Sequence, residues 1–242
     1  TDHHETPYEE TEQGRRQILP PADAVINPHQ EGCPYPFKGL CGAGVAYKLA
    51  VALDKRMTGM DFSEIYLPFA AIATITDVME LVDENRILVK EGLKRLQATE
   101  NTGLLALIAA NGLEPAQIMA YHVGFILGPC LNASGRLHTA KLALSLLKTE
   151  DKDEASVIAG ELVQLNDSRK AMTEQGVRLA KYQVETTSLK NDRVLVIYLP
   201  DCHESIAGII AGRIREAYYR PVFVLTDSAG GGPGSGRSLE EY

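Results

Sequence analysis

The first residues with the chemistry for a reaction are Asp2, His3 and His4. Carboxylate and imidazole side chains bind divalent metals when they are deprotonated. Neighbouring side chains on an extended strand point to opposite faces, but they can converge where the backbone turns at the strand's carboxyl end. Ligands usually bind at such ends in α/β sheets. The triplet therefore fits a metal-dependent reaction, with a charged terminal segment of no function as the alternative.

A further carboxylate, Asp77, lies in the most apolar stretch of the chain, residues 65–81. This stretch is apolar nearly all round, which predicts a buried helix. A carboxylate inside such a helix needs a partner, because an unpaired buried charge is costly. The partner is either a helix cap or a neighbouring arginine, or else a metal shared with the residues at the start of the chain.

Two segments of small residues could approach a phosphate. Residues 128–135 predict a loop that runs into a helix over 136–147, where free backbone N–H groups could bind an anion. An ordinary helix–helix turn is the alternative. Residues 230–238 contain five glycines, which free the backbone for close approach, and Arg237, which could grip an anion in a bidentate manner. A flexible loop or an unstructured end is the alternative there.

Composition places the chain among globular proteins. With 242 residues, 45% hydrophobic and 23% charged, it is long enough for one large domain or two smaller ones. No apolar run is long enough for a bilayer and no signal peptide is visible. The four cysteines lack C-x-x-C spacing, which predicts reduced thiols in a cytoplasmic protein. Because the chain begins without Met and stops soon after its glycine-rich run, we expect a fragment of a longer protein.

The net charge of −8 argues against a surface that is uniformly basic for nucleic acid. A local basic groove is still compatible with it, because the field in a cleft depends on nearby charges. Carboxylates that hold metals also add to the negative total.

Periodicity predicts helices in the first part of the chain and a β-α-β unit near its end. We expect a loop or short surface helix over 5–17, a strand and turn over 24–28, a loop over 32–44, a buried helix over 45–53, and further helices over 85–96, 102–110 and 115–127. A long helix over 153–185, whole or broken near Gly176, connects to a strand over 193–199, a helix over 205–219 and a strand over 221–225. These two strands should be parallel. The fold class is therefore α/β.

Together these motifs resemble the DHH phosphoesterase superfamily and, within it, the RecJ single-strand-specific exonucleases. The resemblance rests on six stretches, in order along the whole chain: Asp2-His3-His4; residues 75–81 with Glu84-Asn85-Arg86; residues 128–137; Leu165-Asn166-x-x-Arg169; residues 203–213; and residues 234–238. The triplet alone is weak. The Gly-Pro-x-x-Asn-Ala-x-Gly-Arg and His-x-x-x-x-Gly-Ile-x-Ala-x-Arg stretches are highly specific.

The resemblance implies a metal-dependent 5′-to-3′ exonuclease on single-stranded DNA, of DNA repair and recombination, that uses Mn²⁺ or Mg²⁺. It implies His3 and Asp77 as metal ligands, His4 beside the scissile phosphate and Asp2 in support of the cluster. It also implies a set of residues that contact nucleic-acid phosphates: Asn132, Arg136, His203, Gly234, Ser235, Gly236, Arg237 and Ser238. It divides the chain into the later part of a DHH domain over 1–150, a connecting helix over 151–190 and the start of a DHH-associated domain over 191–242.

The sequence departs from the family pattern in three ways. No Asp-x-Asp motif precedes the triplet, so most metal ligands of the family are missing and we expect weak or no activity from this chain alone. Cys130 stands where the family usually has arginine, which predicts the loss of a phosphate-facing charge. The Gly-Gly-His cluster and the C-terminal DNA-binding domain of the family are also absent from the sequence.

Two other functions compete with exonuclease activity. One is a phosphodiesterase on short oligonucleotides or cyclic dinucleotides, within the same superfamily. The other is a non-catalytic nucleic-acid-binding fragment, whose binding chelators leave unchanged. The Gly-Ser-Gly-Arg-Ser ending and the Gly-Pro-x-x-Asn-Ala stretch favour the exonuclease. Single-stranded DNA is the expected partner, the membrane is not, and the sequence points to no particular helicase or single-strand-binding protein.

Overall fold

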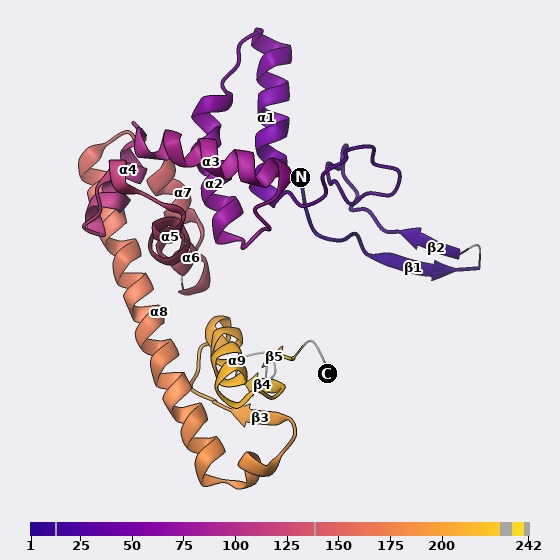
Figure 1. Ribbon diagram of the computed structural model, residues 1–242, viewed down its shortest axis with the longest axis vertical. Helices are drawn as coiled ribbons and strands as arrows, with labels where there is room; N and C mark the ends of the chain where they lie inside the picture. Colours follow the sequence, from indigo (N-terminus) through magenta and orange to yellow (C-terminus); the bar gives the residue numbers. More distant parts are fainter. Residues whose placement is uncertain (13, 138, 228–233, 240–242) are drawn as a thin grey trace. The chain divides into compact units, whose positions relative to one another are not determined.

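The computed structural model describes residues 1–12, 14–137, 139–227 and 234–239, and the chain forms two compact units. The first unit comprises residues 1–129 and 146–159, and the second comprises residues 130–145 and 160–242. Figure 1 shows the elements of each unit, mostly helices in the first and a long helix with a small sheet in the second. The α/β class is confirmed. No helix among the described residues is both long and apolar enough to span a lipid bilayer.

Four helices make the body of the first unit: α1 (Gly42–Thr58), α2 (Ser63–Thr76), α3 (Asp83–Gln97) and α4 (Thr102–Ala110). Helix α2 packs against both α1 and α3. The amphipathic pattern over 85–96 correctly predicts α3, whose inward face carries Asn85, Leu88, Val89, Gly92 and Leu96. The prediction over 102–110 coincides with α4, which starts where the Asn101 side chain accepts a hydrogen bond from the Leu104 N–H at 2.9 Å.

Helix α1 is only partly buried. It begins at Cys41, whose thiol accepts from the Gly44 N–H at 3.4 Å, and ends at Gly59, which has a φ of +73°. Val45 lies in the core, as expected. The prediction of a buried helix is wrong for its second half, because Leu53 and Met57 are 45% and 79% exposed.

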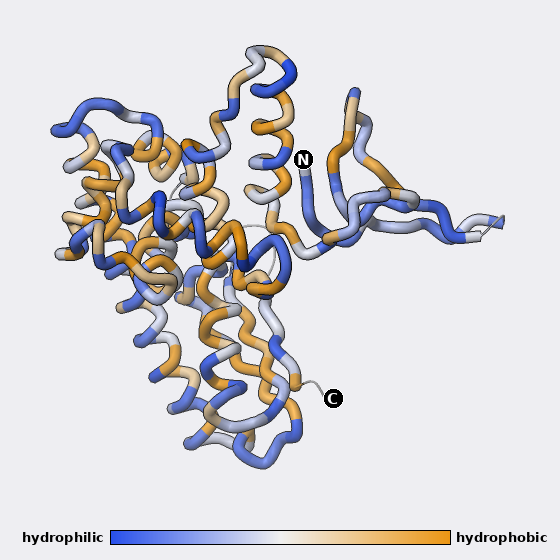
Figure 2. The backbone as a smooth tube through the Cα atoms, turned by 45° about the horizontal axis from the view of Figure 1, so that its top comes forward, coloured by the Kyte–Doolittle hydropathy of each residue, from blue (hydrophilic) through white to orange (hydrophobic). Residues whose placement is uncertain are grey.

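The N-terminal 31 residues differ most from expectation. Residues 5–17 were expected as a loop or surface helix, but β1 (Tyr8–Thr11) and β2 (Gly14–Gln17) pair as an antiparallel hairpin that is hydrophilic along its length (Figure 2). Its register puts Glu9 opposite Arg16 and Glu10 opposite Arg15, and such cross-strand charge pairs stabilise a sheet. The strand predicted at 24–27 is wrong, since these residues have no regular structure; the turn after Asn27 is confirmed.

Residues 128–135 are helical where a loop was expected. The short turns η1 (Pro115–Gln117) and α5 (Ala120–His122) lead into a π-helical turn, η2 (Val123–Leu127). Helices α6 (Gly128–Leu137) and α7 (Lys141–Lys148) follow. The loop predicted over 128–135 is therefore wrong. Because the helical backbone runs on from η2 into α6, the N–H groups of this stretch are not presented as a phosphate-binding helix start.

The second unit contains most of α8 (Lys152–Thr186), a single helix of 35 residues that continues through Gly176. After η3 (Ser188–Asn191) come β3 (Leu195–Tyr198), α9 (Glu204–Tyr218) and β4 (Val222–Leu225). Strands β3 and β4 are parallel, which confirms the predicted β-α-β unit. Apolar side chains of α8, α9 and both strands form its core: Ala180, Val184, Leu195, Ile197, Leu199, Ile206, Ala207, Ile210, Ala211, Ile214, Val222 and Val224.

The glycine-rich segment ends in a strand rather than in a loop. Strand β5 (Gly234–Arg237) pairs with β4 in the antiparallel sense and completes a sheet of order β3-β4-β5 within the described residues. The alternative of a flexible loop is therefore wrong for residues 234–237. Residues 230–233, which belong to the same predicted segment, lie outside the described residues.

Candidate active site

The first four residues are fixed by hydrogen bonds to the irregular segment around Asn27. The Asp2 N–H donates to the Ile26 carbonyl at 3.0 Å. The side chain of Asn27, only 4% exposed, donates to the His4 carbonyl at 2.9 Å and accepts from the His29 N–H at 2.9 Å. These bonds hold the triplet in one place although its residues have no regular structure.

The Asp2 carboxylate turns back on the two histidines. It accepts hydrogen bonds from the His3 N–H at 2.8 Å and from His4 Nδ1 at 2.7 Å. The hydrogen bond from the His4 side chain, followed by that from the His3 backbone, lowers the pKa of Asp2 to about 2. An ionised carboxylate only accepts hydrogen bonds, so Nδ1 of His4 carries a proton. The His4 side chain is 76% exposed, which leaves its Nε2 available to a ligand.

The ring of His3 packs inward. Its side chain is 17% exposed and lies over Gly42, where an added Cβ would stand 3.5 Å from the His3 Cδ2 atom. Its ring centroid is 4.4 Å from that of His4. Nε2 of His3 lies 3.5 Å from Oδ2 of Asp77. The structure thus brings together two side chains that are 74 positions apart in the sequence, both of them predicted metal ligands.

Asp77 lies just beyond the last turn of α2. Its N–H donates to the Ala73 carbonyl at 2.8 Å, and its side chain is 50% exposed. The expectation of a carboxylate buried inside a helix is therefore wrong, because α2 ends at Thr76. The next residue, Val78, has a φ of +56°, a left-handed conformation that is rare for a β-branched side chain. This turn directs the chain away and leaves the Asp77 carboxylate free to face His3.

Two buried polar contacts hold the elements that carry these groups. The Cys41 thiol and the Thr74 hydroxyl are 3.6 Å apart and join the start of α1 to the last turn of α2. Asn85, which is fully buried, donates to the Gly39 carbonyl at 2.7 Å and to the Glu80 carbonyl at 3.0 Å. Sequence reasoning quoted Asn85 in a motif but gave it no role. The signal was an asparagine on the apolar face of a predicted helix, where buried polar groups need partners.

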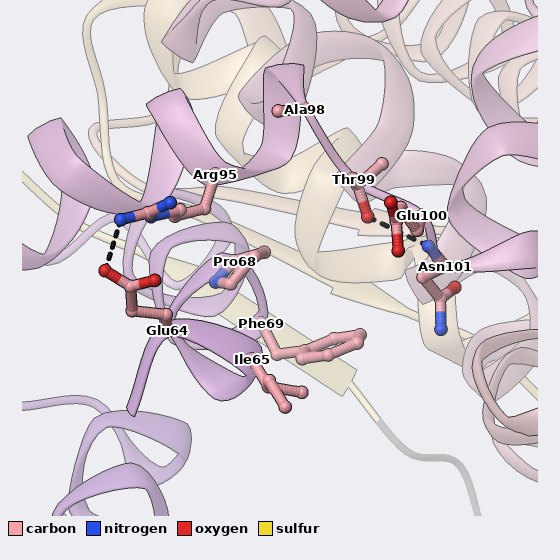
Figure 3. Close-up of a pocket in the computed structure, with 9 residues that line it drawn as sticks. All are labelled: Glu64, Ile65, Pro68, Phe69, Arg95, Ala98, Thr99, Glu100 and Asn101. Carbon is pink, nitrogen blue, oxygen red and sulfur yellow. Dashed lines mark hydrogen bonds and ion pairs between the residues drawn. The ribbon is translucent and has the colours of Figure 1, made fainter. Parts of the chain in front are cut away.

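Among the described residues, no group of three or more His, Cys, Asp or Glu side chains could hold a metal ion. His3 and Asp77 are a pair of adjacent ligand groups rather than a whole coordination sphere. A pocket between α2 and the end of α3 lies elsewhere (Figure 3). An ion pair between Glu64 and Arg95 crosses it, and none of Asp2, His3, His4 and Asp77 lines it. Its chemistry is therefore separate from that of the candidate active site.

In the second unit, several predicted phosphate contacts gather at the first turns of α9. Arg136, at the end of α6, donates through Nη1 to the Ser205 carbonyl at 2.9 Å. His203 caps α9, and its Nδ1 accepts from the Ser205 N–H at 3.2 Å. Asn132, one turn before Arg136 on α6, is exposed.

Strand β5 lies against the same helix. An added Cβ on Gly208 would stand 2.8 Å from Ser235 Oγ and 3.0 Å from Arg237 Nη2. Arg237 Nη1 donates to Ser235 Oγ at 3.2 Å, and the Ser238 carbonyl accepts from Arg215 at 3.3 Å. The structure therefore brings Arg136, His203, Ser235 and Arg237 to one end of α9. Gly234 and Gly236 lie against β4, where an added Cβ would meet Leu225 and Phe223, and Ser238 bonds to Arg215 in the last turn of α9.

A scan against models of protein families finds no match. Among curated proteins, the chain is 38% identical over 100% of its length to the single-stranded-DNA-specific exonuclease RecJ of Bacillus subtilis (strain 168), and covers 29% of that protein. It is 35% identical over 92% of its length to the RecJ of Escherichia coli (strain K12), and covers 41% of it. The chain thus spans less than half the length of these relatives.

Solved structures give the same result. A crystal structure of RecJ in complex with Mn²⁺ from Thermus thermophilus matches with a TM-score of 0.78 and 36% identity, over 91% of this chain and 32% of that one. A crystal structure of exonuclease RecJ bound to manganese matches with a TM-score of 0.77 and 36% identity, over 92% of this chain and 54% of that one. A complex with Mg²⁺ from the same Thermus species matches with a TM-score of 0.75.

Proposed function

Because this chain corresponds, over nearly its whole length, to one portion of the proteins of the RecJ family, we propose that it takes part in metal-dependent hydrolysis of phosphodiester bonds in single-stranded DNA. The observation that carries the proposal is the 3.5 Å separation between His3 Nε2 and Asp77 Oδ2. Attack proceeds from the 5′ end in this proposal, in the service of DNA repair and recombination. The relatives are named single-stranded-DNA-specific exonucleases, which supports hydrolysis that starts at a chain end.

His3 and Asp77 fit one edge of a Mn²⁺ or Mg²⁺ site. Adjacent ligands around a six-coordinate Mg²⁺ stand about 3.0 Å apart, given metal–oxygen distances near 2.1 Å. The separation of 3.5 Å in this chain needs only a small closure to match. A metal held by His3 and Asp77 would supply an activated water molecule and charge neutralisation on the phosphoryl oxygens. In the family that the chain resembles, an Asp-x-Asp motif supplies further ligands.

Asp2 and His4 act on the phosphate in this proposal. Asp2 holds His4 through Nδ1 and keeps its ring oriented, so that the exposed Nε2 faces the scissile phosphate. When protonated, Nε2 donates a hydrogen bond to a phosphoryl oxygen; when neutral, it accepts a proton from the attacking water. The Nδ1 atom of the ring donates to the ionised Asp2 in both cases.

The residues at the end of α9 hold the DNA backbone. Asn132, Arg136 and His203, with the 234–238 segment and its Arg237, offer hydrogen-bond donors to phosphate oxygens. Phosphate contacts of this kind give binding that depends on salt and little on sequence.

The domain division at residues 150 and 190 stays a proposal. No disulfide joins the described cysteines, which supports the proposal of a cytoplasmic protein.

Metal binding by the purified chain tests the proposal directly. The loss of the free Mn²⁺ signal in electron paramagnetic resonance gives the affinity for the ion. Asp77→Asn should weaken Mn²⁺ binding by at least about tenfold, because even groups that only support metal ligands contribute that much. Glu91→Gln is the matched control, since Glu91 is an exposed carboxylate on α3 that pairs with Lys94 at 2.9 Å. Equal affinity in both variants would rule out Asp77 as a ligand.

Hydrolysis of labelled oligonucleotides separates the competing functions. We expect weak Mn²⁺-dependent turnover from this chain alone, because it presents two ligand groups of a larger set. Robust turnover would contradict that expectation. Cleavage of a dinucleotide in preference to a long oligonucleotide would favour a phosphodiesterase on short substrates. Binding of single-stranded DNA that a chelator leaves unchanged, without any cleavage, would favour a non-catalytic module.

A further inference from the structure

The second unit contains a cavity of about 280 Å³ between α8 and the loop that joins β3 to α9. It lies beyond the carboxyl end of β3, which is parallel to β4. Ligands of α/β folds usually bind at the carboxyl ends of parallel strands. Of the predicted phosphate contacts, only His203 is among the described residues that line it. The cavity is therefore a separate candidate site for a ligand.

The wall that α8 contributes is apolar, with bare backbone at its centre. Met172, Gly176 and Leu179 line it, and because they are three or four residues apart they share one face of the helix. An added Cβ on Gly176 would overlap the Cδ1 atom of Ile210 and stand 4.0 Å from the Cys202 sulfur. Bare backbone between two apolar side chains accommodates the face of a planar ring.

Charge favours a neutral ligand in this cavity. The described residues that line it include one carboxylate, Asp201, and no lysine or arginine. Asp201 is exposed and repels a phosphate group that approaches it, because like charges repel. The volume of the cavity is close to the lower end of the range of roughly 300–1,000 Å³ for small-molecule sites. The ligand that fits is therefore small, neutral and largely apolar.

Polar groups at the cavity offer hydrogen bonds to the edge of such a ring. The Gln175 side chain makes no hydrogen bond with the described residues, so both its donor and its acceptor are available. Nδ1 of His203 accepts from the Ser205 N–H at 3.2 Å, which leaves the proton of the neutral ring on Nε2 as a further donor. A glutamine amide matches the paired donor and acceptor groups on the edge of a base.

We propose that this cavity binds one nucleobase of a single-stranded substrate. The base lies against the wall of Met172, Gly176 and Leu179, and its edge bonds to Gln175. The proposal rests on the proposed function for the class of ligand, and it deepens that function because it adds contact with a base to the contacts with phosphates. Contact with the flat face of a ring tolerates every base, since each base has such a face.

Protection of the Cys202 thiol tests occupancy of the cavity in EDTA, where no cleavage occurs. Cys202 lines the cavity and is half-buried, and the half-buried Cys33 of the first unit is an internal control. Alkylation of each cysteine by iodoacetamide is followed by peptide mass spectrometry, at alkaline pH because burial raises the pKa of the Cys202 thiol. Two ligands of equal length are compared: a single-stranded oligonucleotide, and an abasic oligomer with the same number of phosphates.

The oligonucleotide, at about ten times its dissociation constant, should slow the alkylation of Cys202 by about tenfold, because only the free protein reacts. It should leave Cys33 unchanged, and the abasic oligomer should protect neither thiol. Protection of Cys202 by both oligomers would overturn the proposal, since phosphates alone would then account for it. Protection by neither oligomer would also overturn it.

Gln175→Leu removes the contact with the base edge without changing any charge. It should weaken binding of the oligonucleotide by about fivefold, the loss of one neutral hydrogen bond, and leave binding of the abasic oligomer unchanged. The slope of log K against log salt concentration should also stay the same, because no phosphate contact is lost. Gln164→Leu is the matched control, since Gln164 is an exposed glutamine of α8 outside the cavity. Equal losses for both oligomers, or no loss for either, would contradict the contact of Gln175 with a base.

Both measurements are independent of the metal, which separates this proposal from the proposed function. Selective protection of Cys202 by the oligonucleotide supports the base site even if the chain binds no Mn²⁺. If the chain hydrolyses DNA and the oligonucleotide leaves Cys202 unprotected, the base site is wrong and the proposed function stands.

Discussion

Gly128 is a position where a single methyl group should disturb the candidate active site. Its backbone is helical, with φ −59° and ψ −48°, so alanine can adopt its conformation without strain. An added Cβ, however, would overlap the Cγ2 atom of Thr76 and stand 2.8 Å from the Val123 carbonyl oxygen. Carbon atoms in contact are normally about 3.5–4.0 Å apart. Gly128→Ala must therefore push the end of α2 away from η2.

Two opposing terms set the size of the effect. Replacing glycine by alanine inside a helix stabilises it by about 1 kcal/mol. Overpacking of a filled interior costs about 1–3 kcal/mol, and an overlap of this depth belongs at the upper end of that range. We therefore expect Gly128→Ala to lower the free energy of unfolding by about 1–2 kcal/mol. Because Asp77 directly follows Thr76, the affinity of the Gly128→Ala variant for Mn²⁺ should fall as well.

Gly160→Ala is the matched control. Gly160 is also a helical glycine, in α8, but an added Cβ there meets nothing within 4 Å. This variant should gain about 1 kcal/mol from helix propensity alone. Urea unfolding followed by circular dichroism measures the free energy of unfolding of both variants. Thr76→Ser removes the methyl group that the new Cβ strikes, so it should restore much of the stability of Gly128→Ala. A gain in Gly128→Ala equal to that in Gly160→Ala would refute the reasoning.

Three further predictions concern the supports of the site. Val78→Gly should stabilise the chain by about 0.5–1 kcal/mol in thermal unfolding, because Val78 is 88% exposed and its φ of +56° strains the backbone of a β-branched residue. A lower melting temperature in this variant would show that the backbone at Val78 is not strained. Asn85→Ala should cost about 1–3 kcal/mol in urea unfolding, because the fully buried amide that donates to the Gly39 and Glu80 carbonyls is lost; a loss below 1 kcal/mol would contradict this. Burial raises the pKa of Glu84, but hydrogen bonds from Tyr35 and Lys48 outweigh it and hold that pKa below the usual 4.5. The ionised Glu84 therefore stabilises the fold above pH 4.5, and this stabilisation is lost as the pH falls further. In Glu84→Gln the free energy of unfolding should fall less steeply with decreasing pH than in the wild type. An unchanged pH profile of stability would contradict this role of Glu84.

The local sequence pattern correctly predicts those elements whose apolar residues recur at regular spacing. Helix α4, helix α3 and the β3-α9-β4 unit follow from apolar spacing, because each buries one face or one strand of regular periodicity. The long α8 also follows, since its interior has a single glycine between residues 161 and 185 and no proline.

Local pattern failed where packing at a distance overrides propensity. Residues 128–135 are rich in small residues, which favours a loop by composition. They form a helix because Gly128 lets its backbone approach Thr76, a contact that no local rule contains. The N-terminal hairpin was missed for a similar reason, as its strands are polar on both faces and are joined by paired charges.

The residue types alone establish which chemistries are present: a carboxylate and two imidazoles at the start, a second acid near an apolar helix, and basic residues in motifs that resemble a nuclease family. Which of these groups come into contact depends on tertiary packing. The 3.5 Å approach of His3 to Asp77 depends on Asn27, Asn85 and the turn at Val78. Such distances arise because helices that are far apart in the sequence pack against one another. Local sequence patterns do not show which helix faces will be in contact.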